Sequence, residues 1–390
     1  MKISEINKLG KELELYTTID YIGKGFPIIL PRGAKVIKFL RNNVENLLEQ
    51  NGFKAVRTPS MSNVEIYKVE DRYQSEKQNL FIVKDSENEI VLKPYVQPFH
   101  CSIFKLGSHS YKELPIKYCE TSTVFRNERD LKGIMRTRQV TLSDASVFCE
   151  ASKVKNEIKD LLKIQLEFVR KIGISMTYRI SLWDTNHKED YIGNIDEWDS
   201  VAQAMKESLD ELGLKYEIDT NAKMFGPSIS LFFNEIEFSV LQVDFEITHR
   251  FELKYTAKDT NEYFPMYMHH TIVGSYENLL NILIEKYQGE FPFWMAPVQA
   301  VVISDGEEYD DYATEIKNKL QKIIKIEMDN SQSSIQNKIE KNLKLKVPII
   351  IEVGKEELNS NTLKALINNV EKNYEIEELT KEVINWQTKF

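Results

Sequence analysis

Four arginines and a glutamate crowd into the stretch between residues 126 and 138, and they form the clearest chemical pattern in this sequence. Arg126 and Glu128 follow a predicted strand, in which side chains two residues apart share a face. Because arginine grips phosphate through paired hydrogen bonds, Arg126 can hold an α-phosphate, and the Glu128 carboxylate can accept from an adenine amino group. Arg136, across a loop, can reach the distal phosphates. The pattern predicts a nucleotide site for phosphoryl or acyl-adenylate chemistry, which needs fixed cations where charge develops.

Plainer alternatives exist for the same residues, namely a solvated loop or a surface ion pair on a strand.

Two predicted strands, 116–125 and 138–148, must position these residues as an antiparallel pair around the basic loop. The periodicity of apolar residues also predicts a hairpin at 80–92 whose polar turn is 85–88. Helices are predicted at 31–51, 153–173, 198–213 and 274–288, and further strands at 53–57, 177–183 and within 228–252.

The order of predicted elements changes after residues 291–297, a segment that resembles a linker. Strands at 298–304, 326–328 and 347–353 alternate with helices at 309–324 and 334–345, which favours a small α/β domain with a largely parallel sheet. The predicted fold class is α+β: an antiparallel sheet with helices in domain 1–293, followed by the small α/β domain 294–390.

Composition limits the function classes. The chain has 390 residues, 42% hydrophobic and 28% charged, so it can bury a sizeable core. Its net charge of −9 argues against holding nucleic acid by bulk charge alone. Three cysteines without a CxxC pair favour a reducing, cytoplasmic location. The sequence contains no apolar run of about 18 residues, so no membrane span is predicted.

The order of Arg126-Asn127-Glu128, a basic loop and Arg136-Thr137-Arg138 resembles the second signature motif of class II aminoacyl-tRNA synthetases. The wider sequence is similar to the threonyl-tRNA synthetases in particular. Further segments carry this resemblance in the family's order: Leu9–Leu15, Leu30–Gly33, Glu113–Pro115, Phe225–Pro227, Leu241–Phe245, Gly274–Glu277 and Phe291–Gln299.

The resemblance implies roles for individual residues. Arg126 would contact the α-phosphate, Glu128 the adenine amino group, Arg136 the distal phosphate and Gln242 the nucleotide. Asp144 falls where the family has an aspartate that faces the amino acid. The expected cofactors are ATP and Mg²⁺. The helix predicted at 31–51 resembles part of the family's first motif, a dimer element, and so implies a homodimer.

By this resemblance, two of the three ligands of the family's zinc site are missing from this chain. The family binds threonine with zinc held by one cysteine and two histidines, and here Gln97, Ser146 and His269 occupy those positions. A catalytic zinc needs about three protein ligands, mostly nitrogen or sulfur. His270 is no substitute, because adjacent side chains on a strand point to opposite faces. Zinc is therefore not expected, and threonine specificity of the family's kind is expected to be lost.

Other departures concern the nucleotide and tRNA. The resemblance implies that Asn278 replaces the arginine of the family's third motif, which holds the γ-phosphate, and that Val140 replaces an aromatic residue that stacks on adenine. Both changes imply weaker ATP binding. Leu142 replaces a polar residue of the pocket. Residues 298–390 carry 13 lysines, 17 acids and no arginine. Because phosphate contacts dominate affinity for nucleic acid, tRNA is a doubtful partner. No counterpart of the family's N-terminal editing region is expected.

Three functions remain open. The first is an enzyme that uses ATP to activate an amino acid or related carboxylic acid as an acyl-adenylate, then passes the acyl group to tRNA, a carrier protein or a small amine, without zinc. The second is a catalytically inactive paralogue that serves as a regulatory or structural subunit. The third is a divergent tRNA synthetase whose zinc-free pocket still takes threonine.

Overall fold

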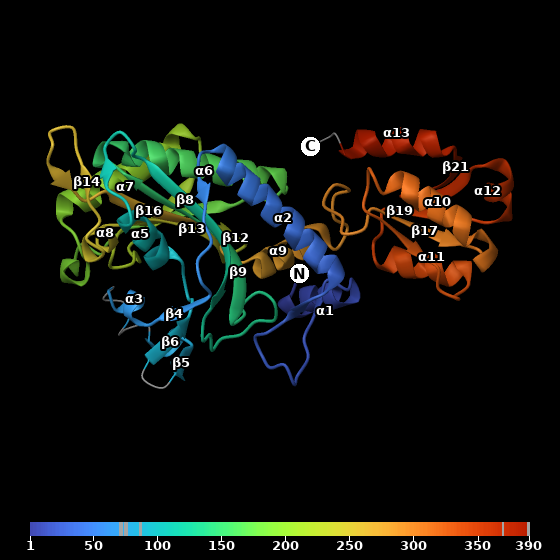
Figure 1. The fold of residues 1–390 in the computed structure, drawn as a ribbon, viewed down its shortest axis with the longest axis horizontal. Coiled ribbons are helices and arrows are strands. Elements are labelled where there is room, and N and C mark those ends of the chain that lie inside the picture. Colours follow the sequence, from blue (N-terminus) through green and yellow to red (C-terminus); the bar gives the residue numbers. More distant parts are fainter. Residues whose placement is uncertain (70–72, 74–76, 86–87, 369, 388–390) are drawn as a thin grey trace. The chain divides into compact units, whose positions relative to one another are not determined.

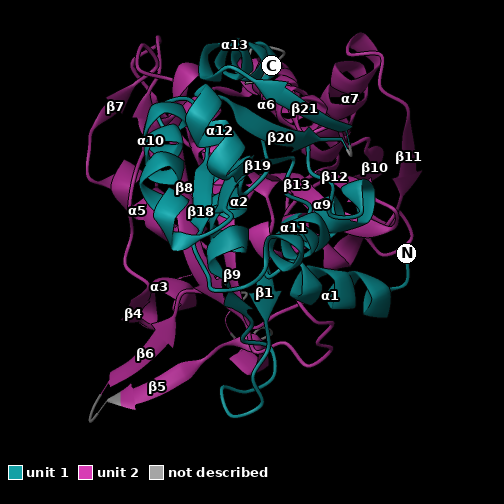
Figure 2. Cartoon of the chain, turned by 90° about the vertical axis from the view of Figure 1, so that its right-hand side faces the viewer, with its two compact units in different colours: residues 1–39, 280–390 teal, residues 40–279 magenta. Residues whose placement is uncertain are grey.

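The computed structural model describes residues 1–69, 73, 77–85, 88–368 and 370–387. The chain divides into two compact units, which Figure 2 shows in different colours. The large unit consists of residues 40–279, and the small unit combines residues 1–39 with residues 280–390. The boundary predicted near residue 294 remains a prediction.

An eight-stranded sheet organises the large unit (Figure 1). Its strands run antiparallel to their neighbours except for the two outermost pairs, which are parallel. In spatial order they are β11 (Tyr216–Asp219), β10 (Thr177–Ser181), β12 (Ser228–Phe233), β13 (Ile236–Asp244), β16 (Met266–Val273), β9 (Gln139–Cys149), β8 (Ile116–Phe125) and β3 (Lys54–Ala55).

The register of β8 against β9 sets the geometry of the candidate site. The two strands pair from Ile116 opposite Phe148 to Phe125 opposite Gln139, which confirms the predicted antiparallel pair. Glu120 lies directly opposite Asp144, and directly opposed side chains occupy the same face of a sheet. The pairing therefore brings residues far apart in the sequence to one surface.

Helices cover the two faces of this sheet. On one face, α5 (Gln97–Lys105) packs Phe104 onto Phe148, with ring centroids 4.5 Å apart. On the other face, Gln165 of α6 (Val154–Lys171) accepts a hydrogen bond from Ser239 of β13. The neighbouring α7 (Ile195–Glu211) begins with a capping box at Asn194, which satisfies its first free backbone donors. The face beneath α5 is the one that bears the site.

Two smaller sheets complete the large unit. The predicted hairpin is present as β5 (Ile82–Asp85) and β6 (Asn88–Leu92), although residues 86–87 of its turn lie outside the described residues. Strand β4 (Met61–Asn63) pairs with β6, and α3 (Glu65–Lys68) follows it. The other sheet consists of β15 (Glu262–Tyr263), β14 (Tyr255–Thr256) and β7 (His109–Ser110).

In the small unit, helices cover both faces of a five-stranded sheet. Its order is β18 (Ile326–Asp329), β17 (Ala300–Ser304), β19 (Ile349–Val353), β20 (Leu363–Ile367) and β21 (Val370–Tyr374). Apolar residues of α10 (Asp310–Leu320) and α13 (Ile376–Gln387) pack with one face. Those of α11 (Ile335–Lys344) pack with the other, and α12 (Lys355–Ser360) joins β19 to β20. Only the first three strands are parallel, because β20 and β21 run antiparallel.

The amino-terminal elements are α1 (Ile3–Glu12), β1 (Tyr16–Thr17), β2 (Ile28–Ile29) and α2 (Pro31–Gln50), the last being the predicted first-motif helix. The helix predicted at 274–288 is α9 (Tyr276–Tyr287). One strand prediction needs correction: within 228–252 the second strand ends at Asp244, and α8 (Ile247–Arg250) follows. Asp244 Oδ1 accepts the backbone N–H groups of Glu246 and Ile247, which favours a helical turn over further strand.

Candidate active site

A single cavity of about 870 Å³ in the large unit gathers most of the residues that the sequence singled out. Its walls come from β9, β10, β11, β12, β13 and β16, together with the connection from β8 to β9. The predicted residues that line it are Gln97, Arg126, Glu128, Arg136, Asp144, Gln242 and His269, together with Val140 and Asn278. Ser146 and Leu142 are not among its lining residues.

Ser146 lies on the same sheet face, but α5 covers it. Its hydroxyl is 2.8 Å from Nδ1 of His100 and 2.9 Å from the Tyr267 hydroxyl, and the residue is fully buried. His100 thus occupies the space in front of Ser146. A role for Ser146 in contacting substrate stays a prediction, and the observed contacts are those of a support for His100.

Arg126 begins the connection that leaves β8. Its backbone N–H donates to the Arg138 carbonyl at 2.8 Å, and its Nε donates to the Pro94 carbonyl at 3.4 Å. These two bonds fix the base of the side chain and leave the terminal guanidinium nitrogens available to the cavity. The geometry suits an arginine that receives an anion.

Arg136 and Glu128 contact each other in the free protein. Nε of Arg136 lies 3.0 Å and its terminal nitrogen 2.7 Å from Oε2 of Glu128, with Asp130 a further 3.5 Å contact. The Arg136 side chain is 49% exposed, so this pair contributes little to stability. The surface ion pair considered from the sequence is thus present, although between Glu128 and Arg136. A nucleotide could replace it at low cost.

Asp144 is the most deeply buried acid of the cavity. It is 2% exposed, and its Oδ1 has no hydrogen-bond partner among the described residues, whereas Thr271 donates to the carboxylate. Burial raises the pKa of Asp144, and the hydrogen bond from Thr271 together with the nearby Arg126 guanidinium opposes this effect. The cavity therefore holds a buried carboxylate oxygen that has no hydrogen-bond donor among the described residues.

Gln97 and His269 face the same cavity. Gln97 is the first residue of α5 and 6% exposed, and its Oε1 has no partner among the described residues. His269 lines the cavity, whereas His270 points to the opposite face, where its Nε2 is 3.0 Å from the Ser239 hydroxyl. Burial, with a smaller effect of His269, lowers the pKa of His270 to about 3, so this ring is neutral. The expectation that the two histidines do not converge is confirmed.

These residues do not fit a zinc ion. Of the three positions that hold the metal in the family, only His269 offers a nitrogen ligand, and the Ser146 hydroxyl is engaged by two partners. No group of three or more His, Cys, Asp or Glu side chains suited to a metal occurs within the described residues.

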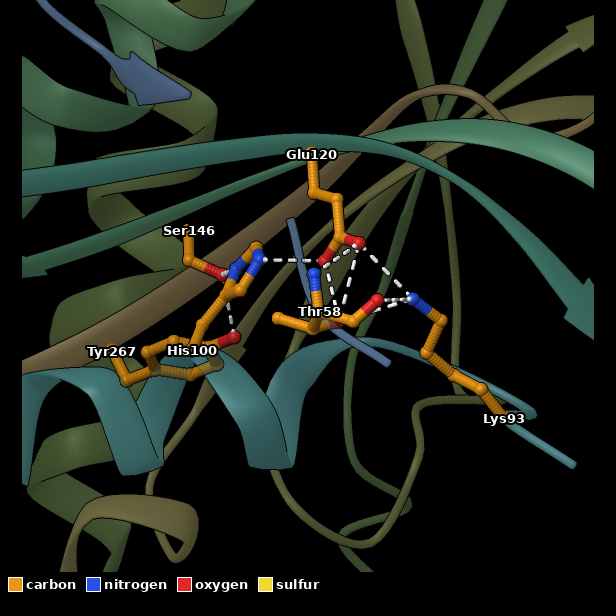
Figure 3. Close-up of polar contacts among 6 residues, drawn as sticks. All are labelled: Thr58, Lys93, His100, Glu120, Ser146 and Tyr267. Atoms are coloured by element: carbon orange, nitrogen blue, oxygen red, sulfur yellow. Dashed lines mark hydrogen bonds and ion pairs between the residues drawn. The ribbon is translucent and has the colours of Figure 1, made fainter. Parts of the chain in front are cut away.

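A buried polar network supports the cavity from below, and Figure 3 shows its members. Lys93 and Glu120 form a fully buried ion pair of 3.0 Å, and Thr58 bonds to both through its hydroxyl. Nε2 of His100 lies 3.5 Å from the Glu120 carboxylate. Although burial alone would raise it, contacts with His100, Thr58 and Lys93 lower the pKa of Glu120 to about 2. Glu120 is therefore ionised at neutral pH.

The third-motif segment supports the other end of the cavity. The Glu277 carboxylate accepts the backbone N–H of Thr141 at 3.0 Å and the Ser275 hydroxyl at 3.0 Å. Its neighbour Asn278 is buried, and the side-chain Oδ1 has no partner among the described residues. The predicted loss of a cation here corresponds to an uncharged amide on the cavity wall.

The side chain of Gln242 bonds to Gly226, where two backbone segments pack very closely. Its Nε2 donates to the Gly226 carbonyl at 3.3 Å. Gly226 has φ +154°, and a Cβ there would lie 2.0 Å from the Val243 carbonyl oxygen, so only glycine fits. This close approach allows the Phe225-Gly226-Pro227 segment to pack directly against the strand that carries Gln242.

Sequence reasoning missed one wing of the cavity, formed by β10, β11 and β12. Arg179 packs its guanidinium over the Phe232 ring at 4.6 Å and lies within 3.8 Å of Asp219. Ser228 and Ser230 alternate with buried apolar residues on β12. That alternation of polar residues on an otherwise apolar strand was the available signal.

Comparison with known proteins agrees with this geometry. A family model described as "tRNA synthetase class II core domain (G, H, P, S and T)" matches residues 67–287, and one described as "Anticodon binding domain" matches residues 299–386. The chain is 33% identical over 395 residues to a threonine–tRNA ligase of Clostridium botulinum, with 97% of this chain covered. It is 34% identical over 368 residues to that of Geobacillus kaustophilus, with 91% covered. It spans 61% and 56% of these relatives' own lengths.

Solved structures show the same fold. A structure described as the RNA binding domain of threonyl-tRNA synthetase from Cryptosporidium parvum has a TM-score of 0.87 and 25% identity, with 98% of each chain covered. Giardia lamblia prolyl-tRNA synthetase, solved with prolyl-adenylate, has a TM-score of 0.76 at 16% identity, with 99% of this chain and 80% of that chain covered. The chain belongs to the class II aminoacyl-tRNA synthetases. Within that class its relatives are threonyl-tRNA synthetases.

Proposed function

We propose that this protein activates an amino acid, or a related carboxylic acid, with ATP to form an acyl-adenylate, and that it does so without zinc. The observation that carries the proposal is the convergence of Arg126, Glu128, Arg136, Gln242 and Asp144 on one cavity. Membership of class II supports ATP as the second substrate and Mg²⁺ as its metal ion. The acyl acceptor is tRNA or another nucleophile.

The proposed chemistry is positional and electrostatic. The substrate carboxylate attacks the α-phosphorus of ATP, a bond forms between carboxylate oxygen and phosphorus, and pyrophosphate leaves. Arg126 binds the α-phosphate and stabilises the charge that develops there. Glu128 holds the adenine amino group, and Arg136, released from Glu128, holds the distal phosphates. No covalent enzyme intermediate is needed, because holding the carboxylate and ATP in line accelerates the reaction.

ATP–pyrophosphate exchange tests the proposal directly, with the natural amino acids and simple carboxylic acids as candidate substrates. We expect exchange with a restricted set of acids. Arg126→Ala should lower the exchange rate by about 10²–10³-fold, the usual effect of removing one such charge-stabilising donor. Arg129→Ala is the matched control, because this arginine is also exposed but does not line the cavity, and it should exchange at the normal rate.

Zinc independence is tested separately by metal analysis of the purified protein. Exchange that survives a strong chelator of transition metals, with Mg²⁺ restored afterwards, supports it. Stoichiometric zinc that is required for exchange would refute it.

A second function, an inactive paralogue that regulates or supports a partner, is favoured by one observation. Asn278 and Val140 line the cavity where a cation and an aromatic ring would strengthen ATP binding. Calorimetry with ATP and Mg²⁺ separates the two functions. Absence of both ATP binding and exchange would leave the paralogue; exchange with any acid would exclude it.

A further inference from the structure

A second cavity, of about 660 Å³, lies within the small unit. It is at the end of the five-stranded sheet where Ile349, the first residue of β19, pairs with Ile367, the last residue of β20. Of the twelve described residues that line it, nine are apolar, and the other three are Glu290, Lys346 and Asn368. A cavity of roughly 300–1,000 Å³ with apolar walls and a few polar groups is typical of a small-molecule site.

Three aromatic side chains contribute to the lining of this cavity. Phe293 and Trp386 meet edge to face, with ring centroids 5.6 Å apart and an angle of 79° between the rings. Both are only partly buried, although they pack against an apolar core of the small unit, and Phe291 is 8% exposed. Because aromatic rings prefer edge-to-face or offset contacts with one another, this lining favours a planar, aromatic ligand.

Lys346 belongs to the turn that ends α11 and has an unusual backbone conformation. Its φ is +54°, in the left-handed region. Its N–H donates to the Leu343 carbonyl at 3.0 Å, and the N–H of Val347 donates to the Asn342 carbonyl at 3.1 Å. These two bonds form the Schellman motif, in which glycine usually occupies the left-handed position. A lysine at this position strains the backbone, because its Cβ is crowded in this conformation.

The ion pair that Lys346 forms does not account for this strain. Its Nζ lies 2.7 Å from Oε1 of Glu290, but the two side chains are 38% and 71% exposed. An exposed pair stabilises a protein by less than the left-handed conformation costs a residue other than glycine. Stability alone would therefore favour glycine at position 346. Among the described residues, Lys346 is the one cation that lines this cavity, and uncompensated backbone strain points to a functional role.

We propose that this cavity binds a small aromatic carboxylate. The ring of the ligand packs against Phe293 and Trp386, and its carboxylate replaces Glu290 as the partner of Lys346. Exchange of the exposed Glu290 contact costs little, whereas the new contact is stronger because it forms beside an apolar cavity. A nucleic acid does not suit this site, since binding of its phosphates needs several cations. The site is separate from the proposed function, and neither depends on the other.

Calorimetry with the full chain tests the site with probes that differ in charge. Benzoate, indole-3-carboxylate and naphthalene-2-carboxylate are each compared with the corresponding uncharged amide. We expect at least one carboxylate to bind about tenfold or more tightly than its amide, because it makes a hydrogen bond between two charged groups. Equal binding of every carboxylate and its amide would overturn the proposal. So would the failure of all three carboxylates to bind at millimolar concentration.

Substitutions of Lys346 separate its charge from its backbone strain. Lys346→Gly removes both, so it should abolish the preference for the carboxylate and raise the melting temperature by a few degrees. Lys346→Gln removes the charge alone and should abolish the same preference without the gain in melting temperature. A lower melting temperature for Lys346→Gly would mean that the pair with Glu290 accounts for the lysine, and would overturn the proposal.

The matched control is Lys341→Gln. Lys341 is also an exposed lysine of α11, pairs with Asp329 at 3.0 Å and does not line the cavity, so the variant should bind each probe as the wild type does. Loss of the preference for the carboxylate in this control would contradict a specific role for Lys346. Circular dichroism confirms that each variant is folded.

Trp386→Leu tests the aromatic part of the site. It should weaken the binding of carboxylate and amide alike by about tenfold, because both lose a ring contact. Unchanged binding would place the probes elsewhere and overturn the site. Displacement of a bound carboxylate by total tRNA at micromolar concentration would also overturn it, because the cavity would then be part of an RNA-binding surface. None of these measurements uses ATP–pyrophosphate exchange, so failure of this site and failure of the proposed function are distinguishable.

Discussion

At the scale of single residues, the cavity combines satisfied and unsatisfied groups in a consistent way. Glu120 has three kinds of partner and is stabilised as an anion, whereas Asp144, opposite it on the next strand, accepts a hydrogen bond only from Thr271 among the described residues. Structural carboxylates are normally paired when they are buried. Glu120 is thus part of the scaffold, and the contrast supports the proposed role of Asp144 in substrate binding, although the two look alike in the sequence.

Asp144→Asn should therefore stabilise the unliganded protein. Because burial raises its pKa, the folded state binds the Asp144 proton more tightly than the unfolded state does. As pH rises through the ordinary aspartate range, the unfolded chain ionises first, so the wild-type protein loses stability until the folded pKa is passed. The variant avoids this loss, and its melting temperature should exceed the wild type's by a few degrees at neutral pH, with no difference at strongly acidic pH.

Thermal unfolding across pH measures this difference, with Asp160→Asn, which changes an exposed carboxylate on α6, as the control. An equal or lower melting temperature for Asp144→Asn at neutral pH would contradict the inference that its charge is uncompensated. Loss of ligand binding together with gained stability is the trade-off expected of a binding residue.

Seven of the eight candidate site residues line one cavity, and the resemblance to the family had already grouped them. Arg126, Glu128 and Arg136 lie on or between two adjacent strands whose pairing is nearly a hairpin. The contacts of Ser146 could not be foreseen, because they depend on α5, which is short and was not predicted from its mixed sequence Gln-Pro-Phe-His-Cys. Whether a strand residue opens to a cavity or is capped by a helix depends on non-local packing, which periodicity does not encode.

At the scale of elements, the Lys93–Glu120 pair joins the segment before α5 to β8. The Lys93 carbonyl accepts the Phe125 N–H at 2.8 Å, and the next carbonyl, of Pro94, accepts from Arg126. The same segment leads directly into Gln97. One buried ion pair thus anchors the backbone segment that places both Arg126 and Gln97 on the cavity wall.

Lys93→Met should strongly destabilise the protein, because it leaves Glu120 buried and uncompensated. We expect a loss of about 3–5 kcal/mol in the free energy of unfolding, measured by denaturant titration. The double variant Lys93→Met/Glu120→Gln removes both charges and should recover a large part of that loss. Equal stabilities of the single and double variants would contradict a buried charge as the cause.

The same pair sets a pH dependence of opposite sign to that of Asp144. The pKa of Glu120 falls from 4.5 to about 2 on folding, so its contribution to stability is complete above about pH 4.5 and disappears as pH falls towards 2. Glu120→Gln should flatten that acid limb of the stability curve. An acid limb that is unchanged in this variant would assign acid unfolding to other carboxylates.

At the scale of the whole molecule, positive charge is unevenly distributed between the cavity and the carboxy-terminal segment. The arginines that line the cavity all belong to the large unit. In the carboxy-terminal segment, residues 298–390 contain 13 lysines against 17 acids. Lys364, on β20, is engaged by Glu352 at 3.4 Å and Glu371 at 3.3 Å. The segment that matches the anticodon-binding family model thus has an acidic balance, and Lys364 on β20 is already paired with two carboxylates.

A homodimer is the expected assembly, because α2 and the segment to Pro59 resemble the family's first motif. Sedimentation velocity at micromolar concentration should give the mass of two chains. The variant Arg41→Glu, which reverses a half-exposed charge on α2, should shift the equilibrium towards monomer if this helix lies at the interface, whereas Lys155→Glu on α6 should not. A monomeric wild type would refute the assembly.

Binding to tRNA is expected to be weak and non-specific. Phosphate contacts supply most of the affinity for nucleic acid, and the acidic balance of residues 298–390 opposes them. Titration with total tRNA at physiological salt should give a dissociation constant no tighter than about 10⁻⁴–10⁻⁶ M, the range of non-specific complexes, with charging weak or absent. Lys364→Ala should change neither quantity, because two carboxylates already hold this lysine, whereas Glu352→Gln/Glu371→Gln should tighten binding by releasing it. Robust charging that is lost in Lys364→Ala would instead show that β20 reads the anticodon despite its charge, and would favour tRNA as the acyl acceptor.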